Sequence, residues 1–266
     1  MEHLDDATAV RESIRRGEQV LGGWVSIGHP AVAEITAGAD FDFVTIDVEH
    51  ASMSIETVEN LVRAVHTVPG ETVPFVRPPS ADPVAIKRVL DTGAGGLLVP
   101  RVDSAAEAKQ VVEASTYPPD GIRGTGAGRA AAYGADLPAY LESADEALTR
   151  IVQIETEAAV DAAADIAAVD GIDALFVGPA DLSAALDCHL DFSDSRFEEA
   201  VETVFEAGDA HDVPVGVFAT EPQQVVDWIQ SGYDFAIVGY DAKFLREGTA
   251  ELVDAFEAGI YGFDEP

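Results

Sequence analysis

Eight short apolar segments, separated by stretches with helical patterning, recur along this chain of 266 residues. Most of them are nearly continuous runs of apolar or β-branched residues, which is typical of parallel strands buried on both faces. The segments are 20–27, 41–48, 72–78, 95–102, 150–156, 174–179, 213–220 and 234–241. This alternation predicts an α/β fold, a single-domain (β/α)8 TIM barrel over residues 1–266. A doubly wound parallel sheet is the alternative.

Helical patterns fill the gaps between these segments and carry recognisable ends. Ser54 is suited to cap the helix that follows it, and Asp82 with Pro83 opens another helix that stops at Gly93. The predicted helical stretches are 54–66, 82–93, 104–115, 156–169, 195–211, 221–232 and 242–259.

One connection is longer than the others and covers residues 117–149. It begins YPPDGIRGTGAGRAAAYG, and its glycines and paired prolines exclude an uninterrupted helix. Loops of this length in compact domains are usually functional or disordered, so we expect an active-site loop. The alternative is a tolerated excursion on the surface.

The charge of the chain is strongly one-sided. Forty-nine acidic residues against fifteen basic ones give a formal net charge of −34, which argues against binding to nucleic acid or anionic membranes. Such acidity is spread over the helices and predicts a halophile's protein, because molar salt screens the repulsion within a few ångströms. An ordinary acidic protein is the alternative. The N-terminus lacks a signal-peptide pattern, no long apolar run occurs, and Cys188 is the only cysteine. A cytoplasmic protein is therefore expected.

Ionisable and amide side chains collect at the ends of the predicted strands. In a barrel these ends meet at one rim, where active sites lie. The residues concerned are Asp47, Glu49, His50, Arg77, Gln153, Glu155, Asp181 and Asp241. Their convergence predicts a catalytic site.

Two acids from neighbouring strands, Glu155 and Asp181, are candidate metal ligands. Two carboxylates plus water suit Mg²⁺ or Mn²⁺, and they leave coordination positions for a substrate. The alternative is that each acid caps the helix that follows it.

His50 and Arg77 are candidates for proton transfer and for carboxylate binding. Histidine side chains in general titrate near neutrality, so His50 is a candidate general base, with Asp47 or Asp91 orienting its ring. A capping or packing role is the alternative for His50. Arg77 can bind a carboxylate through two N–H groups, and an ordinary salt bridge is its alternative.

Other reaction classes lack their residues. The strands carry no lysine for a Schiff base, and neither FATEP nor GYDAKF after the last two strands forms a glycine-rich phosphate site. Cys188 has no base at a neighbouring strand end.

The motifs FDFVTIDVEH, VRPPSADPVAIKRVLDTGAGGLLVPRVDS, YPPDGIRGTG, IVQIET and GIDALFVGPADLS occur in this order. In order and spacing, over about residues 17–250, the chain resembles the HpcH/HpaI-type class II pyruvate aldolases. The resemblance implies cleavage of a 4-hydroxy-2-oxo acid, of the 2-keto-3-deoxy sugar acid or 4-hydroxy-2-oxoheptanedioate type, to pyruvate and an aldehyde. A divalent metal, Mg²⁺ or Mn²⁺ with Co²⁺ as a further candidate, would stabilise the pyruvate enolate.

The resemblance also assigns roles to individual residues. It implies that His50 is the base, that Asp47 and Asp91 orient it, and that Arg77 binds the oxo acid. It implies metal ligation by Glu155 and Asp181 and a substrate-binding role for Gln153, Gly178, Pro179 and Ala180. Asp47 and His50 would form a proton-handling pair, with Glu49 bracing the loop. Family members form homohexamers, trimers of dimers that exchange the last helix, here within residues 254–263.

Two segments depart from the family pattern, 184–197 and the strand end VGYD, where a small residue often precedes the aspartate. Because of these two segments, the resemblance does not identify the aldehyde product. The main alternative function is an acyl-CoA lyase related to the citrate-lyase β-subunit, which would need basic groups for the CoA phosphates. A non-catalytic oxo-acid-binding barrel and a phosphosugar isomerase are further alternatives.

Overall fold

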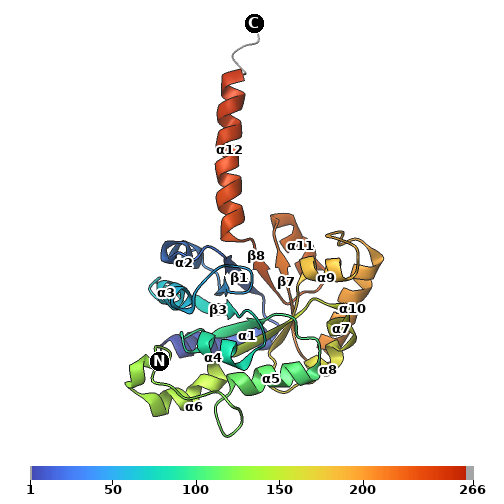
Figure 1. The fold of residues 1–266 in the computed structure, drawn as a ribbon. Helices are drawn as coiled ribbons and strands as arrows, with labels where there is room; N and C mark the ends of the chain where they lie inside the picture. Colours follow the sequence, from blue (N-terminus) through green and yellow to red (C-terminus); the bar gives the residue numbers. More distant parts are fainter. Residues whose placement is uncertain (1, 262–266) are drawn as a thin grey trace.

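The computed structural model of the protein describes residues 2–261 and contains a closed barrel of eight parallel strands in sequential order (Figure 1). The strands are β1 (Val20–Val25), β2 (Phe43–Asp47), β3 (Val73–Arg77), β4 (Gly96–Val99), β5 (Thr149–Ile154), β6 (Ala174–Val177), β7 (Val215–Ala219) and β8 (Phe235–Val238). Strand β8 pairs with β1 and closes the barrel. The predicted (β/α)8 barrel is confirmed, and the doubly wound sheet is wrong.

Helices alternate with the strands around the barrel. They are α1 (Glu2–Arg15), α2 (Pro30–Ala37), α3 (Ile55–Val65), α4 (Pro83–Leu90), α5 (Ala105–Ser115), α6 (Leu137–Ala147), α7 (Glu157–Asp161), α8 (Ala163–Ala167), α9 (Pro179–Ala185), α10 (Ser195–His211), α11 (Pro222–Gln230) and α12 (Asp241–Tyr261). Every predicted helical stretch contains a helix, although 156–169 is divided into α7 and α8. Helix α2 was not predicted, because it is short and lacks one of the usual N-cap residues. Its N-cap is His29, whose side chain accepts the backbone N–H of Ala31.

The long connection, residues 117–149, contains the 3-10 turn η1 (Ala132–Gly134) and α6. The exclusion of an uninterrupted helix is confirmed. The segment joins the end of α5 to the start of β5, so it lies at the end of the barrel where the strands begin. A hydrogen bond from Arg11 Nη1 to the backbone carbonyl of Glu146 joins it to α1. Active sites of barrels lie at the opposite end. Residues 117–149 could therefore contribute only to the active site of a neighbouring copy, and their role as an active-site loop stays a prediction.

Phenylalanine rings fill the barrel interior, and three of them fold over glycines on the neighbouring strand. The cross-strand pairs are Gly22 with Phe43, Gly96 with Phe75, and Gly216 with Phe235. A Cβ atom added at any of the three glycines would overlap the ring of its partner. These positions therefore require glycine, because any side chain would occupy the space of the neighbouring ring.

Helix α1 covers the end of the barrel where the strands begin. Its residues Ala7, Val10 and Ile14 are buried in the same apolar cluster as the interior phenylalanines. Arg11 also forms an ion pair with the buried Asp173 at 3.0 Å. With this end covered by α1, the site is expected at the opposite end.

Helix α12 projects away from the barrel (Figure 1). Lys243, in its first turn, forms an ion pair with Glu221, the N-cap of α11, at 2.8 Å and another with Glu247 of α12 itself at 2.9 Å. Its large apolar side chains are exposed: Phe244, Leu245, Leu252, Val253 and Phe256. Of the predicted exchange segment 254–263, residues 262 and 263 lie outside the described part of the chain. No helix within residues 2–261 has the length and apolarity needed to cross a membrane.

Candidate active site

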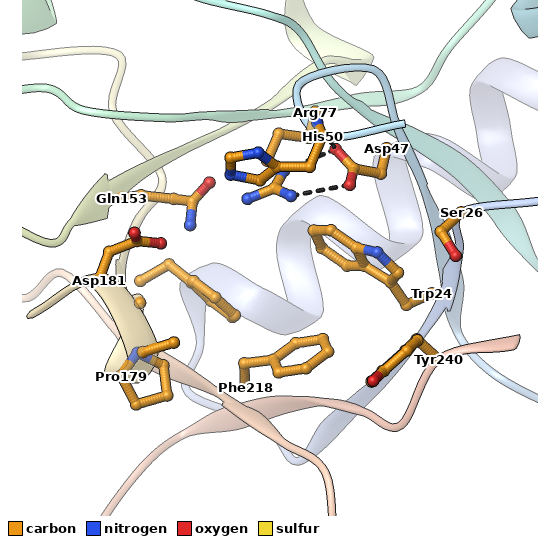
Figure 2. A pocket seen from close by; sticks show the side chains of 13 residues that line it. Trp24, Ser26, Asp47, His50, Arg77, Gln153, Pro179, Asp181, Phe218 and Tyr240 are labelled. Atoms are coloured by element: carbon orange, nitrogen blue, oxygen red, sulfur yellow. Dashed lines mark hydrogen bonds and ion pairs between the residues drawn. The ribbon is translucent and has the colours of Figure 1, made fainter. Parts of the chain in front are cut away.

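A cavity of about 320 Å³ opens at the C-terminal ends of the strands (Figure 2). Most of the residues singled out in the sequence line it. These are Asp47, His50, Arg77, Gln153, Gly178, Pro179, Ala180 and Asp181. They come from the ends of four strands, so the barrel brings together side chains that are far apart in the sequence.

At the end of β2 the carboxylate of Asp47 organises the following turn. Its Oδ1 accepts the backbone N–H groups of Glu49 and His50 at 3.0 and 3.3 Å. Arg77, from the adjacent strand, donates Nε and Nη2 to the two oxygens of Asp47 at 2.9 and 2.8 Å. Both side chains are buried. The pair therefore fixes the backbone from which His50 projects.

Arg77 is also bound to Glu49, through Nη1 at 2.9 Å. Burial raises the pKa of the Glu49 carboxyl, while Arg77 and His50 oppose that rise. Asp47 thus accepts two of the five N–H groups of the guanidinium, and Glu49 is paired with Nη1 by charge. The contact is the one expected of a residue that braces the loop.

The His50 side chain is 66% exposed, and its Nε2 lies 3.7 Å from Glu49 Oε2. Helix α3 is capped by Ser54, so His50 does not cap it. Among the hydrogen bonds of the described residues, Asp47 contacts the backbone of His50 and not its ring. Orientation of the ring by Asp47 stays a prediction, and Glu49 is the carboxylate next to the ring in this chain.

Glu155 follows β5 and is 3% exposed. Its Oε1 accepts the backbone N–H of Arg101 at 2.8 Å, and its Oε2 accepts from Gln153 Nε2 at 3.1 Å. Burial, reinforced by the nearby carboxylates of Asp181 and Glu49, raises the pKa of Glu155 to about 7. Thr156, and not Glu155, caps α7.

Asp181 lies in the first turn of α9, whose N-cap is Gly178. A Cβ at Gly178 would lie 2.8 Å from Glu155 Oε2, so this close approach requires glycine. Asp181 is therefore carried beside Glu155 by a turn that leaves room for the glutamate carboxylate.

The donor set fits a divalent cation. The carboxylates of Glu155 and Asp181 repel each other, and this repulsion contributes to the raised pKa of Glu155. A cation bound between them would lower that pKa again. Gln153 adds an amide oxygen, Oε1, that is buried without a hydrogen-bond partner. Within residues 2–261 no group of three or more His, Cys, Asp or Glu side chains is placed to bind a metal. The two acids would leave several positions open.

Asp91 is the predicted residue that lies elsewhere. It ends α4, near the start of the strands, and its carboxylate is 3.8 Å from Arg123 Nη2. Burial raises the pKa of Asp91, and Arg123 and Lys87 oppose the rise. Within one chain Asp91 does not meet His50, so its orienting role requires a neighbouring copy.

Sequence reasoning missed the apolar part of the cavity. Its residues are Trp24, Phe176 and Phe218. The sequence carries no signal for them, because these residues have the same pattern as the core residues of apolar strands. Tyr240, in the VGYD segment noted as a departure, also lines the cavity.

Asp241, also expected at the rim, has a structural part. Its oxygens accept the Ser26 N–H at 3.0 Å, the Ile27 N–H at 2.7 Å and the Ser26 hydroxyl at 2.6 Å. It ties the end of β1 to the start of α12.

Comparisons with known proteins give a consistent result. The model of the HpcH/HpaI aldolase/citrate lyase family matches residues 21–248. The chain is 40% identical over 246 residues to a 4-hydroxy-2-oxovalerate aldolase of Novosphingobium aromaticivorans, covering 91% of each chain. It is 37% identical over 251 residues to a 4-hydroxy-2-oxo-heptane-1,7-dioate aldolase of Salmonella dublin, covering 94% of this chain and 95% of that one.

A solved structure agrees with the sequence relatives. An HpcH/HpaI aldolase/citrate lyase family protein from Burkholderia cenocepacia superposes with a TM-score of 0.90 at 34% identity, over 94% of this chain and 99% of that one. Fold and sequence point the same way, and the chain belongs to the HpcH/HpaI aldolase/citrate lyase family.

Proposed function

We propose that this protein is a divalent-metal-dependent aldolase that cleaves a 4-hydroxy-2-oxo acid to pyruvate and an aldehyde. The observation that carries the proposal is the meeting of Arg77, His50 and Asp181 in one cavity, with Glu155 directly beside it. The aldolase names of the relatives support the same reaction. The substrate is of the 2-keto-3-deoxy sugar acid or 4-hydroxy-2-oxoheptanedioate type.

Glu155 and Asp181 would hold the metal, Mg²⁺ or Mn²⁺, with Co²⁺ as a further candidate. When bound, the ion supplies a Lewis acid that stabilises negative charge developing on a substrate oxygen. Gln153 stays within 3.1 Å of Glu155 and keeps its carboxylate oriented.

Arg77 binds the oxo acid in this proposal. Its N–H groups that are not donated to Asp47 would bind the substrate carboxylate, while Asp47 and Glu49 hold the guanidinium in place. The positive charge of Arg77 balances the charge that develops as the bond breaks.

His50 removes the proton of the 4-hydroxyl group, and Glu49 stabilises the imidazolium that results. As that proton leaves, the C4–O bond becomes a carbonyl and the C3–C4 bond breaks. Its electron pair passes to C3 and is delocalised to the 2-oxo oxygen as an enolate. Protonation at C3 then gives pyruvate, and the other product is the aldehyde.

The alternative is an acyl-CoA lyase of the citrate-lyase β-subunit type. The phosphates of CoA need several basic partners. Among the described residues that line the cavity, only Arg77 carries a permanent positive charge, and it is already bound to two acids. The cavity therefore favours the aldolase.

We also propose the remaining family expectations for this chain. It is a single-domain protein of the cytoplasm of a halophile. It assembles as a hexamer, a trimer of dimers that exchange α12. The exposed apolar side chains of α12 support the exchange, and Asp91 would reach His50 only through such an assembly.

Proton exchange on pyruvate tests the activity without knowledge of the aldehyde. The protein is incubated in high KCl with Mn²⁺ and pyruvate in D₂O, and loss of the methyl signal is followed by NMR. Exchange that EDTA and Glu155→Gln abolish is the expected result. Glu157→Gln, the same change two residues away on the exposed face of α7, is the matched control and should retain exchange. Absence of exchange in the folded wild type would contradict the proposal, and CoA-thioester cleavage would then be assayed.

A further inference from the structure

A second cavity, of about 270 Å³, lies at the end of the barrel where the strands begin. Its wall is formed by the start of α1, the end of α3, the residues that precede β4, and the long connection 117–149. Among the residues that the structure describes, it shares none with the active-site cavity. Four of its side chains carry basic nitrogen: His3, Arg63, His66 and Arg129. In a chain with fifteen Lys and Arg against forty-nine acids, such a grouping favours an anionic ligand.

Arg129 is built into the wall of this second cavity. Its Nη1 donates to the carbonyl of Thr92 at 2.5 Å, and its Nη2 lies 2.9 Å from Nδ1 of His66. A Cβ atom at Gly93, whose φ is +90°, would lie 2.5 Å from Nη1. Glycine at this position therefore leaves room for the guanidinium, and the backbone before β4 holds it at the cavity.

Arg129 is a half-buried cation that has no carboxylate partner among the side chains that the structure describes. Burial lowers the pKa of Arg129, and the positive charge of Arg63 adds to this effect. Glu59 opposes the effect, but its carboxylate is bound to Arg63. Buried cations are normally paired with an acid. An anion in the second cavity would supply the missing negative charge.

His66 adds a hydrogen-bond donor to the same cavity. A guanidinium can only donate, so Nδ1 of His66 accepts from Arg129 and Nε2 carries the hydrogen of the neutral ring. Burial, reinforced by His3 and Arg129, lowers the pKa of His66 to about 3, which keeps the ring neutral at pH 7. No hydrogen bond of the described residues uses this Nε2–H, and three of the five N–H groups of Arg129 are unused as well. The second cavity thus has donors that lack acceptors.

The long connection completes the wall with a strained turn. Ala132 and Tyr133 have φ angles of 47° and 56°, in the left-handed region that residues other than glycine rarely adopt. The hydroxyl of Tyr133 accepts from Arg63 at 2.6 Å, which joins this turn to α3. Asp136 is the one acid among the described lining residues, and as the N-cap of α6 its carboxylate accepts the backbone N–H of Ala139. Strained turns of this kind are found at ligand sites.

We propose that the second cavity binds a phosphate group, as free phosphate or as part of a small phosphorylated molecule, through Arg63, Arg129 and His66. A phosphate dianion has several oxygens, so it can accept from two guanidinium groups and an imidazole at once. Chloride has one charge and no directional oxygens, so it matches this donor set less well. Molar salt screens repulsion from the acidic surface beyond about 3 Å, whereas direct hydrogen bonds persist. The site lies at the opposite end of the barrel from the aldol chemistry and does not depend on the proposed function.

Isothermal titration with inorganic phosphate tests the proposal. The protein is kept at pH 8 in about 2 M KCl, with EDTA present so that no metal binds phosphate. We expect one phosphate per chain with a Kd of about 1 mM. Arg129→Gln should weaken binding by about tenfold or more, because it removes a charged donor. Absence of saturable binding by the folded wild type, or equal affinity in Arg129→Gln, would overturn the proposal.

Matched variants separate the second cavity from other sources of binding. Arg88→Gln removes the same charge at an exposed position of α4 and should keep the wild-type affinity. An equal loss in Arg88→Gln and Arg129→Gln would show an effect of net charge alone and would contradict the proposal. Binding that is lost in Arg77→Lys but kept in Arg129→Gln would place the phosphate in the active-site cavity, against the proposal.

Arg63→Gln provides a second test that leaves the contacts of Arg129 with Thr92 and His66 in place. It should weaken phosphate binding by about threefold or more, and an unchanged affinity would contradict the proposal. If Arg129→Gln does not fold, the wild type and Arg63→Gln decide.

Glycerol 3-phosphate distinguishes the two sources of the phosphate group. Binding that is about threefold or more tighter than that of inorganic phosphate would assign the site to a phosphorylated molecule. Equal or weaker binding would assign it to free phosphate. Glycerol alone is the control and should not bind.

Discussion

Arg77 donates to both carboxylate oxygens of Asp47, from Nε at 2.9 Å and from Nη2 at 2.8 Å. The same carboxylate accepts the backbone N–H of His50 at 3.3 Å. The arginine that is placed to bind substrate therefore also sets the position of the proposed base. Substitutions at Arg77 should affect proton transfer as well as substrate binding.

Arg77→Lys keeps the charge but removes the two-pronged contact with Asp47. We expect kcat/KM for aldol cleavage to fall by roughly 100-fold, and kcat to fall together with it because His50 loses its support. Steady-state kinetics with saturating Mn²⁺ measures both parameters. A rise in KM with unchanged kcat would mean that Arg77 serves binding alone.

Glu155→Gln should weaken Mn²⁺ binding by about 100-fold or more, because the proposed site loses one of its two negative charges. Isothermal titration in the absence of substrate measures the affinity. Glu157→Gln provides the control with the same loss of charge on the exposed face of α7. Equal affinities in wild type and Glu155→Gln would exclude Glu155 as a ligand.

His66 should make the fold sensitive to acid. Burial, with His3 and Arg129 nearby, lowers the pKa of His66 from 6.5 to about 3. Below pH 6.5 the imidazole of His66 is thus protonated in the unfolded chain but stays neutral in the folded chain. The free energy of unfolding is therefore highest above this pH and falls as the pH decreases. Between pH 7.5 and pH 5 the loss from this residue is about 2 kcal/mol.

The measurement for His66 is urea unfolding of wild type and His66→Asn at the two pH values. Many carboxylates contribute to the acid sensitivity of both proteins, so the difference between them isolates the imidazole. We expect the variant to lose about 2 kcal/mol less than wild type over this interval. Parallel losses would show that the ring is protonated in the folded state.

The net charge of −34 predicts a strong dependence of stability on salt. Molar salt shortens the screening length to about 3 Å, which removes most of the repulsion between surface carboxylates. We expect Tm to rise by about 10 °C between 0.1 M and 2 M KCl. Differential scanning calorimetry at both concentrations tests this, and an unchanged Tm would argue against adaptation to high salt.

The exposed apolar residues of α12 predict that this helix packs against a neighbouring copy in the proposed hexamer. Leu252→Glu with Phe256→Glu puts charge on side chains that are 73% and 69% exposed in the single chain. We expect these two substitutions to lower the oligomeric mass measured by light scattering. The paired change Glu251→Gln with Glu257→Gln on the same helix is the control. A hexamer that survives the apolar substitutions would rule out exchange through this face.

Residues at strand ends were predictable because the barrel itself brings them together. Once the eight strands were recognised, Asp47, Arg77 and Asp181 had to meet at one rim. The position of Asp91 was not predictable in the same way, because the end of α4 lies near the other end of the barrel. Helix α2 was missed because its capping by His29 gives no ordinary sequence signal.

The apolar part of the cavity shows a different limit. Trp24 and Phe218 look like core residues in the sequence, since an apolar strand residue reads alike whether it faces a neighbouring ring or a cavity. Only the closure of the barrel distinguishes the two environments.

The phenylalanine rings folded over glycines carry a consequence for evolution. At Gly22 and Phe43, Gly96 and Phe75, or Gly216 and Phe235, neither partner can change alone without a clash or a void. Relatives with alanine at the glycine position should carry a smaller side chain at its partner. These three pairs should therefore covary across the family, although no reaction acts on them.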